Sequence, residues 1–275
     1  MIISERKYLN LYSLRVSSFI LLFLNSLNYL QAFGLIIKEG DWGDVETNEI
    51  HEVLSSTLSL FQPYPPTLQK HPIVVSPTVD DPKVLYELRD GHAYQIQLTA
   101  KNRHWCQYVF QFAHELGHIM CNFRKENHAN LWFEESICEV VSLYALSKIG
   151  NKWAKVHNNT NAKSYAQEFE KYRIHRIKES SYPENFQLNA WWNQNRSILS
   201  KNPHLRKQNI WIALTLYDLF DQNPSIAWST CFYLNNSPTH RKADFEQYLQ
   251  TWKNACPERN QKEFIEQIIS RFQFQ

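Results

Sequence analysis

Hydrophobic residues recur at two different spacings along this chain, and the change between them separates an N-terminal from a C-terminal region. Short apolar runs at 35–37, 73–75 and 84–86 predict strands, and alternating apolar and polar residues over 93–99 predict a half-exposed strand. Between 44 and 61 the apolar spacing is three and four, which predicts an amphipathic helix. The helical spacing dominates the rest of the chain. We expect helices over 104–122, 131–149, 164–178, 186–200, 208–221, 225–234, 242–255 and 260–273, separated by prolines and polar loops.

This order of elements predicts an α+β fold. A small N-terminal sheet and two central helices are expected to form a core over 35–150. The helices that follow are expected to form a helical C-terminal lobe over 151–275.

The first 34 residues have the layout of a secretory signal. Lys7 and Arg15 precede the apolar run 19–24, and small or polar residues follow it. Asparagines interrupt the apolar stretch, which makes it unfavourable as a full membrane span. We therefore expect a protein exported to the periplasm or the extracellular space, with no stable membrane span after signal removal. An uncleaved N-terminal membrane anchor is the alternative.

Composition and charge argue against two classes of function. The chain has 29 basic and 27 acidic residues, and its densest basic stretch, 171–178, is interleaved with glutamates. This pattern is typical of a solvated helix face rather than a nucleic-acid surface, so no nucleic-acid partner is expected. The chain has only 6 glycines and neither a P-loop nor a GxGxxG pattern, so a glycine-rich phosphate site is not expected either.

The five cysteines do not form a recognisable metal motif. Their number is odd and no CxxC pair is present, so a structural zinc site is not indicated. Cys231 and Cys256 are candidates for a disulfide if the protein is exported. The alternative is that most of the thiols are small buried hydrophobic groups.

The motif His114-Glu115-Leu116-Gly117-His118 carries the clearest chemistry in the sequence. It lies within the expected helix 104–122, where residues four apart project from the same face. Two neutral imidazoles on one face are a usual start of a zinc site. Glu115, beside His114, can accept a proton from water that zinc has activated. The motif therefore predicts one zinc ion per chain, bound by both histidines, with Glu115 as general base.

A catalytic zinc ion needs a third protein ligand, and the second central helix offers carboxylates for it. Glu134, Glu135 and Glu139 lie in the otherwise apolar stretch 131–149. Buried carboxylates need partners, and a cation is one that suits them. The residues alone leave both Glu134 and Glu135 open as the third ligand.

Taken together, the histidine motif and the sequence Trp132-Phe133-Glu134-Glu135-Ser136 resemble the gluzincins, the thermolysin-like and aminopeptidase-N-like zinc peptidases. The resemblance covers about residues 94–149 and implies a zincin-like catalytic core. The Trp-x-x-Glu-Gly pattern of the group implies Glu135 as the third ligand. It also implies that Glu139, one turn further on, hydrogen-bonds a ligand histidine. The ligand spacing is shorter than in the aminopeptidases, which keeps Glu134 as a competitor.

The resemblance also defines the expected activity. It implies hydrolysis of peptide bonds in a peptide or protein substrate, with the attacking water activated by the metal and by Glu115. The Gly-x-Met-Glu-Asn signature of the aminopeptidases is absent, which argues against an aminopeptidase of that type. The alternative is a catalytically inactive zincin-fold protein that serves as a binding or scaffold module.

Two further parts of the site are implied by the same resemblance. An oxyanion-stabilising Tyr or His is expected from the C-terminal lobe, and a strand above the zinc is expected to pair with the substrate. The oxyanion candidates are Tyr217, Tyr233 and His240. The substrate-strand candidates are Tyr94, Gln95, Ile96 and Gln97, with a plain sheet strand as the alternative.

Overall fold

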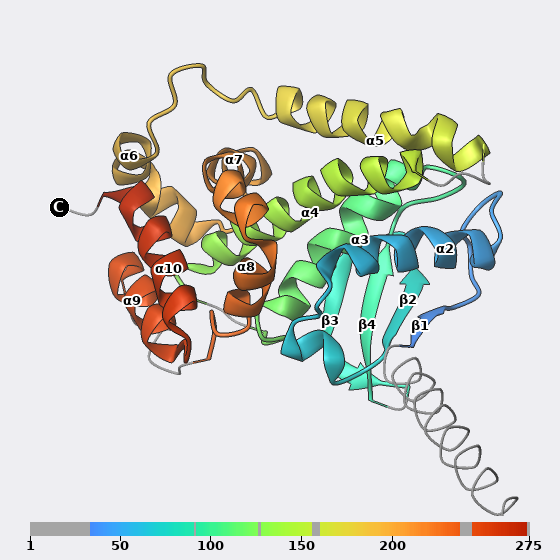
Figure 1. Ribbon diagram of the computed structural model, residues 1–275, viewed down its shortest axis with the longest axis horizontal. Helices are drawn as coiled ribbons and strands as arrows, with labels where there is room; N and C mark the ends of the chain where they lie inside the picture. The colour runs from blue at the N-terminus through green and yellow to red at the C-terminus, as the bar shows by residue number, and fades with distance from the viewer. Residues whose placement is uncertain (1–33, 91, 126–127, 156–159, 237–243, 274–275) are drawn as a thin grey trace, which may run out of the picture.

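The computed structural model describes residues 34–275 except 91, 126–127, 156–159, 237–243 and 274–275 (Figure 1). The expected signal or anchor over 1–34 therefore lies, apart from its last residue, outside the described residues. The oxyanion candidate His240 lies outside them as well.

Four strands form one small mixed sheet. They are β1 (Leu35–Ile37), β2 (Ile73–Pro77), β3 (Lys83–Arg89) and β4 (Ala93–Leu98), in the spatial order β1-β2-β4-β3. The pairs β1–β2 and β2–β4 are parallel, whereas β3 is antiparallel to β4. The antiparallel strand β3 therefore lies at one edge of the sheet, with one side of its backbone unpaired by another strand.

The expected substrate strand is an internal strand, which corrects the interpretation of 93–99. Residues 94–97 of β4 pair with β2 on one side, and β4 pairs with β3 on the other. Tyr94, Gln95 and Ile96 are buried rather than half-exposed. Because both edges of β4 are already hydrogen-bonded, this strand cannot accept a substrate peptide by strand addition.

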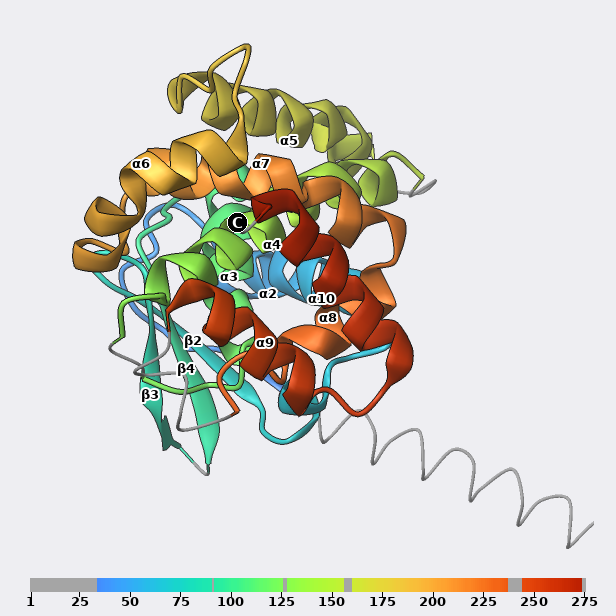
Figure 2. The same cartoon turned by 90° about the vertical axis from the view of Figure 1, so that its left-hand side faces the viewer.

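Two helices pack on the sheet. Helix α2 (Thr47–Leu58) begins with a reciprocal capping box between Glu46 and Glu49 and packs on β1. Helix α3 (Trp105–Met120) packs on β3 and β4 and carries the histidine motif. Figure 2 shows the sheet at one side of the molecule, with the helices stacked away from it. Two short 3-10 segments, η1 (Ser59–Phe61) and η2 (Pro66–Gln69), lead from α2 toward β2.

Helix α4 (Leu131–Ala154) is the centre of the molecule. It packs against α3 on one side and against α5 (Thr160–Glu179) and α7 (Arg206–Gln222) on others (Figure 1). This surrounding explains why its sequence is apolar on nearly all faces instead of along one stripe. The helix runs across residue 150, so the sheet-containing core and the helical C-terminal region share one continuous apolar core.

The remaining helices cover one end of α4. Their amphipathic sequences turn apolar faces toward this core, as the expected helical spacing predicted. Asp244 caps the start of one of them by accepting a hydrogen bond of 2.9 Å from the backbone N–H of Gln247. These helices are α6 (Leu188–Lys201), α8 (Pro224–Cys231), α9 (Phe245–Ala255) and α10 (Arg259–Phe272).

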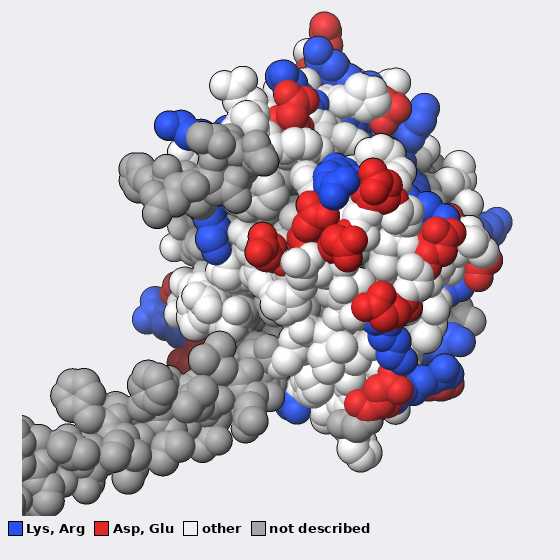
Figure 3. All heavy atoms as spheres, turned by 90° about the vertical axis from the view of Figure 1, so that its right-hand side faces the viewer, with Lys and Arg blue, Asp and Glu red and all other residues white. Residues whose placement is uncertain are grey.

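The α+β class is confirmed, with one four-stranded sheet and nine α-helices in the described part of the chain. None of the described helices is long and apolar enough to cross a membrane. The face in Figure 3 carries acidic and basic side chains interspersed. All five cysteines are buried free thiols, so Cys231 and Cys256 do not form the disulfide considered from the sequence.

Candidate metal centre

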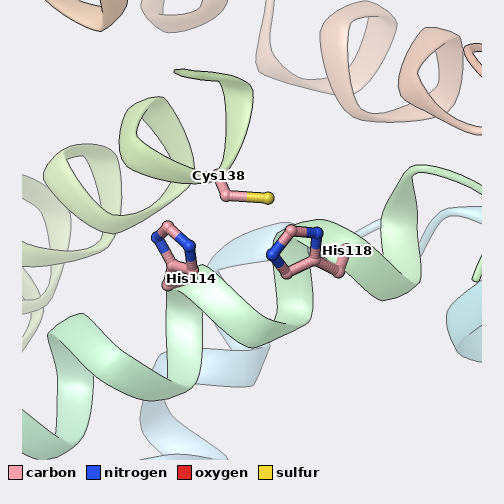
Figure 4. A group of neighbouring side chains, drawn as sticks. All are labelled: His114, His118 and Cys138. Atoms are coloured by element: carbon pink, nitrogen blue, oxygen red, sulfur yellow. The ribbon is translucent and has the colours of Figure 1, made fainter. Parts of the chain in front are cut away.

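The two histidines of the motif face helix α4 across a close helix–helix contact. Gly117 allows this contact, because a Cβ atom there would lie 2.8 Å from Sγ and 3.0 Å from Cα of Cys138. Figure 4 shows His114 and His118 on the face of α3 that points toward Cys138 on α4. Their ring centroids are 5.3 Å apart, so the two imidazoles lie side by side.

The carboxylate of Glu135 faces the Nε2 atoms of both histidines. Its oxygens lie 3.3 Å from Nε2 of His114 and 3.7 Å from Nε2 of His118. Two ligand atoms bound tetrahedrally to one zinc ion, each at a distance of about 2.0–2.1 Å, are about 3.3 Å apart. The distance from Glu135 to His114 matches that spacing, and the distance to His118 is somewhat longer.

Glu134, the competing ligand candidate, contacts a different atom. Its Oε1 lies 2.7 Å from Nδ1 of His118, and its Oε2 accepts a hydrogen bond of 2.6 Å from Nδ2 of Asn235. Tyr248 in turn donates a 3.0 Å hydrogen bond to Oδ1 of Asn235. Glu134 thus orients the His118 ring with Nε2 toward Glu135 and leaves the ligand position to Glu135.

Glu139 lies on the corresponding side of the other histidine. Its Oε1 is 3.8 Å from Nδ1 of His114, which is an ion-pair distance but too long for a hydrogen bond. Its Oε2 is buried and has no hydrogen-bond partner among the described residues. The hydrogen bond expected between Glu139 and a histidine of the motif is therefore not formed, although the carboxylate approaches Nδ1 of His114.

Cys138 offers a second set of ligand atoms. Its Sγ and one nitrogen from each of His114 and His118 lie within 4.8 Å of one another, a spacing that could hold a metal ion. However, Cys138 is fully buried in the α3–α4 contact, whereas Glu135 lines the cleft over the site. Of the two possible partners of the histidines, Glu135 is therefore the one on the cleft side, where a metal could keep an open position.

A cleft of about 700 Å³ opens over the histidines. Glu115 lines it with a side chain that is 4% exposed, and Val84 of the edge strand β3 lies beside it. Burial raises the pKa of Glu115, while the two histidines and a backbone hydrogen bond at Val84 oppose the rise. A carboxylate with a raised pKa, facing a cleft beside two imidazoles, suits proton transfer near neutral pH.

The buried imidazoles and carboxylates of the site shift one another's pKa values. Burial opposes protonation of His114, but the hydrogen bond to Glu135 and the charge of Glu139 outweigh it and raise the pKa of His114. The pKa of His118 is also raised, with burial opposing protonation and Cys138, Tyr86 and Glu135 favouring it. Burial opposes ionisation of Glu135, yet the imidazoles hold its pKa well below the usual range.

This donor set suits a divalent cation. Four glutamates, at 115, 134, 135 and 139, are buried around two histidines. Burial raises the pKa values of Glu115, Glu134 and Glu139, so the ionised forms of these three carboxyl groups are disfavoured in the metal-free protein. A cation bound between the Nε2 atoms and Glu135 would replace the imidazole protons and favour the ionised carboxylates.

His204 is a site residue that the sequence did not indicate. Its Nδ1 lies 3.3 Å from Oε1 of Glu135, and its side chain is 66% exposed at the cleft. It precedes α7 in an exposed loop, where neither helical spacing nor a motif distinguishes it. Tyr86 of β3 was also missed as a site residue. It lines the cleft with its ring centroid 6.4 Å from that of His118.

Two of the oxyanion candidates from the sequence, Tyr217 and Tyr233, do not line this cleft. Tyr217 packs against the apolar core, with Ser147 beside its hydroxyl. Tyr233 also packs against the core, and its ring centroid is 4.9 Å from that of Phe232. Both were expected because they belong to the helical C-terminal region, but Tyr217 on α7 and Tyr233, which follows α8, face core contacts. His204, by contrast, is a residue of the C-terminal region that lies at the cleft beside Glu135.

Comparison of the chain with protein-family models, with curated proteins and with solved structures finds no match. The resemblance to gluzincins therefore rests on the residues of α3 and α4, and a zincin-like core stays a prediction.

Proposed function

We propose that this protein is a zinc-dependent peptidase with one zinc ion bound by His114, His118 and Glu135. The observation that carries the proposal is the approach of the Glu135 carboxylate to both histidines, with Oε2 3.3 Å from Nε2 of His114 and Oε1 3.7 Å from Nε2 of His118, and with Glu115 beside them in an open cleft. Bound zinc polarises a carbonyl group and lowers the pKa of bound water. The chain's own side chains supply the remaining steps.

Glu115 is placed to handle the protons of the reaction. As a carboxylate it accepts a proton from the attacking water. It then delivers that proton to the amine nitrogen that leaves when the peptide bond breaks. Glu134 holds the His118 imidazole by its Nδ1, so that Nε2 is directed toward the metal position, and the charge of Glu139 lies 3.8 Å from Nδ1 of His114.

We assign the substrate backbone to the free edge of β3. This strand is at the end of the sheet order, and Lys83, Val84 and Tyr86 of β3 line the cleft. An extended peptide that pairs with this edge would gain sequence-independent hydrogen bonds. The strand addition expected for 94–97 is thereby transferred to the neighbouring strand.

His204 is the residue we assign to the developing negative charge on the substrate carbonyl oxygen. Its exposed ring lies at the cleft, next to Glu135, and an imidazole N–H can donate a hydrogen bond to an oxyanion. The loss of one such donor typically slows the reaction by about a hundredfold or more.

The test is hydrolysis of a peptide library by the purified chain loaded with zinc. Glu115→Gln should keep one zinc ion per chain and lose at least about a hundredfold of the activity, since only the base is removed. His118→Ala should lose both zinc and activity. Full zinc-dependent hydrolysis by Glu115→Gln would disprove the proposed mechanism.

The position of His204 also favours a second candidate function. If its Nδ1 binds the metal beside Glu135, four protein ligands close the site, and the protein is a metal-stabilised binding or scaffold module. The substitution His204→Ala separates the two functions. Zinc retained with activity lost supports the peptidase, whereas zinc released with no activity in the parent protein supports the closed site.

A further inference from the structure

The cleft extends beyond the metal centre along α3, toward the N-terminal end of that helix. Gln107, Phe110 and Gln111 line this extension, one to two turns before His114. Two arginines from the C-terminal region also line it, Arg176 from α5 and Arg206 from the start of α7. Neither arginine has a role in the proposed proton transfer or metal binding.

Arg176 is held in place beside the metal centre. Its guanidinium carbon lies 4.8 Å from the ring centroid of Phe110, a cation–π distance. Phe110 precedes His114 by four residues, about one helical turn on the same face of α3, and Arg176 and His114 line the same cleft. Glu179 is its ion-pair partner at 3.3 Å, while its buried Nε has no hydrogen-bond partner in the described part of the chain.

Arg206 and Asn209 complete this wall of the cleft. Arg206 pairs with Asp81 at 3.8 Å, and both side chains are largely exposed, so this pair is weak and its guanidinium is available. Asn209 is 2% exposed and donates a 2.8 Å hydrogen bond to the carbonyl of Pro203. Its buried Oδ1 accepts no hydrogen bond from any described residue, so the wall offers an acceptor as well as two cations.

The charge of the whole cleft favours an anionic ligand once a metal is bound. Its lining holds four basic residues, at 83, 125, 176 and 206, and four acidic ones, at 81, 115, 135 and 139. Glu134, buried behind His118, adds a fifth acidic group. A divalent cation at the histidines would make the sum of these charges positive, and Arg176 and Arg206 supply the basic groups on the α5–α7 side.

From these observations we propose that Arg176 and Arg206 form a subsite for a substrate carboxylate next to the bond that is cut. Guanidinium groups bind carboxylates through charge-assisted hydrogen bonds, and Asn209 Oδ1 would accept the backbone N–H of the same substrate residue. The carboxylate comes from an acidic side chain or from the C-terminus of the peptide. That the peptide is cut at this site rests on the proposed function; binding of the carboxylate does not.

The experiment measures peptide binding to zinc-loaded Glu115→Gln protein, in which binding is separated from turnover. Fluorescence anisotropy would compare short labelled peptides that differ in one carboxylate. One series has an amidated C-terminus and Glu or Gln at each position in turn. The other has no acidic side chain and a free or an amidated C-terminus. We expect one series to show about tenfold tighter binding of the carboxylate form.

Substitutions then test whether the two arginines cause the preference for a carboxylate. Arg176→Gln and Arg206→Gln should each reduce the ratio of affinities between carboxylate and neutral peptides. Arg173→Gln is the matched control, because Arg173 lies on the same helix, pairs with Glu170 at 2.7 Å and does not line the cleft. It should leave the ratio unchanged. A partly unfolded variant would bind the carboxylate and the neutral peptide more weakly, but the ratio of the two affinities would not change.

The outcomes separate this inference from the proposed function. A preference that depends on the two arginines, found in a protein that hydrolyses no peptide, would support the subsite and refute the peptidase. Hydrolysis with equal affinity for carboxylate and neutral peptides would refute the subsite alone. A preference unchanged by both arginine substitutions, or no peptide binding at all, would also overturn the inference.

Discussion

At the scale of single residues, the surrounding carboxylates differ in which imidazole nitrogen they approach. Glu135 lies toward the Nε2 atoms, while Glu134 contacts Nδ1 of His118 and Glu139 approaches Nδ1 of His114. Neighbouring helix residues project about 100° apart, so Glu134 and Glu135 must face different atoms. The sequence indicated that both glutamates lie near the histidines. It did not show how α4 is rotated about its axis.

This difference in position predicts that Glu134 and Glu139 affect metal affinity unequally. Glu134→Gln should weaken zinc binding by about tenfold or more, because it removes the charge that orients His118 at 2.7 Å. Glu139→Gln should have a smaller effect, since Glu139 lies 3.8 Å from His114. Competition with a coloured zinc chelator measures both affinities. A larger loss for Glu139→Gln would contradict the assignment.

The raised pKa values of the histidines predict the pH dependence of metal binding. Zinc binds neutral imidazoles, so protons compete with it at His114 and His118. In the metal-free protein the pKa of both rings lies above the usual 6.5, so protons bind the metal-free form more than the metal-bound form. Apparent zinc affinity should therefore rise with pH through these raised values and level off above them.

The slope of that dependence is the quantity to measure. Each proton displaced changes the apparent affinity by about tenfold per pH unit below the pKa of its ring. Chelator competition over a series of buffers gives the midpoint and the slope. A midpoint at or below the ordinary histidine pKa would show that the carboxylates do not favour protonation as the geometry requires.

At the scale of elements, the helical spacing predicted the helices well, whereas the exposure of β4 was misjudged. The alternation in 93–99 suggested that one face meets solvent, yet Gln95 is 7% exposed. Its side-chain amide donates hydrogen bonds to the carbonyls of Arg89 and Ala93, which satisfies a polar group in a buried position. Sequence alternation cannot distinguish a solvated polar residue from one satisfied by its own hairpin.

The contact between α3 and α4 predicts the effect of adding one methyl group. Gly117→Ala should destabilise the protein by about 1–3 kcal/mol and weaken zinc binding. The new Cβ would meet Cys138 at Sγ and Cα, and a backbone atom cannot move unless α4 shifts. This clash outweighs the gain of about 1 kcal/mol in helix propensity. Urea unfolding and chelator competition measure the two effects.

Gly150→Ala is the matched control for that substitution. A Cβ at Gly150 would lie 2.7 Å from the carbonyl oxygen of Ala166 on α5, so this change should also destabilise the chain. Gly150 lies on α4, the helix that carries Glu135, but more than three turns from that residue. Gly150→Ala should therefore leave zinc affinity unchanged. Equal losses of affinity in both variants would mean that the α3–α4 spacing does not set the metal site.

At the scale of the whole molecule, the site is assembled from three regions of the chain. The edge strand β3 and helix α3 form one wall of the cleft, α4 supplies the third ligand candidate, and the α5–α7 side supplies the other wall. Local motifs identified the α3 and α4 parts. They could not identify His204, because its role depends on how the C-terminal helices fold back over α4. For the same reason Tyr217 and Tyr233, chosen by region alone, proved to pack against the core.

The burial of charge at the centre of this assembly predicts that folding and metal binding are linked. Zinc should raise the melting temperature, because a cation that binds only the folded chain stabilises it by RT ln(1 + [Zn]/Kd). At a hundredfold excess over Kd this is about 2.7 kcal/mol, or about 5–10 °C for a chain of this size. Scanning calorimetry at increasing zinc concentration measures the shift. His114→Ala should abolish it, since a ligand is lost. Glu115→Gln should preserve it, since the base is not a ligand. A shift of equal size in the unmodified protein and in both variants would show that the stabilising zinc binds elsewhere. The buried glutamates would then have no bound cation.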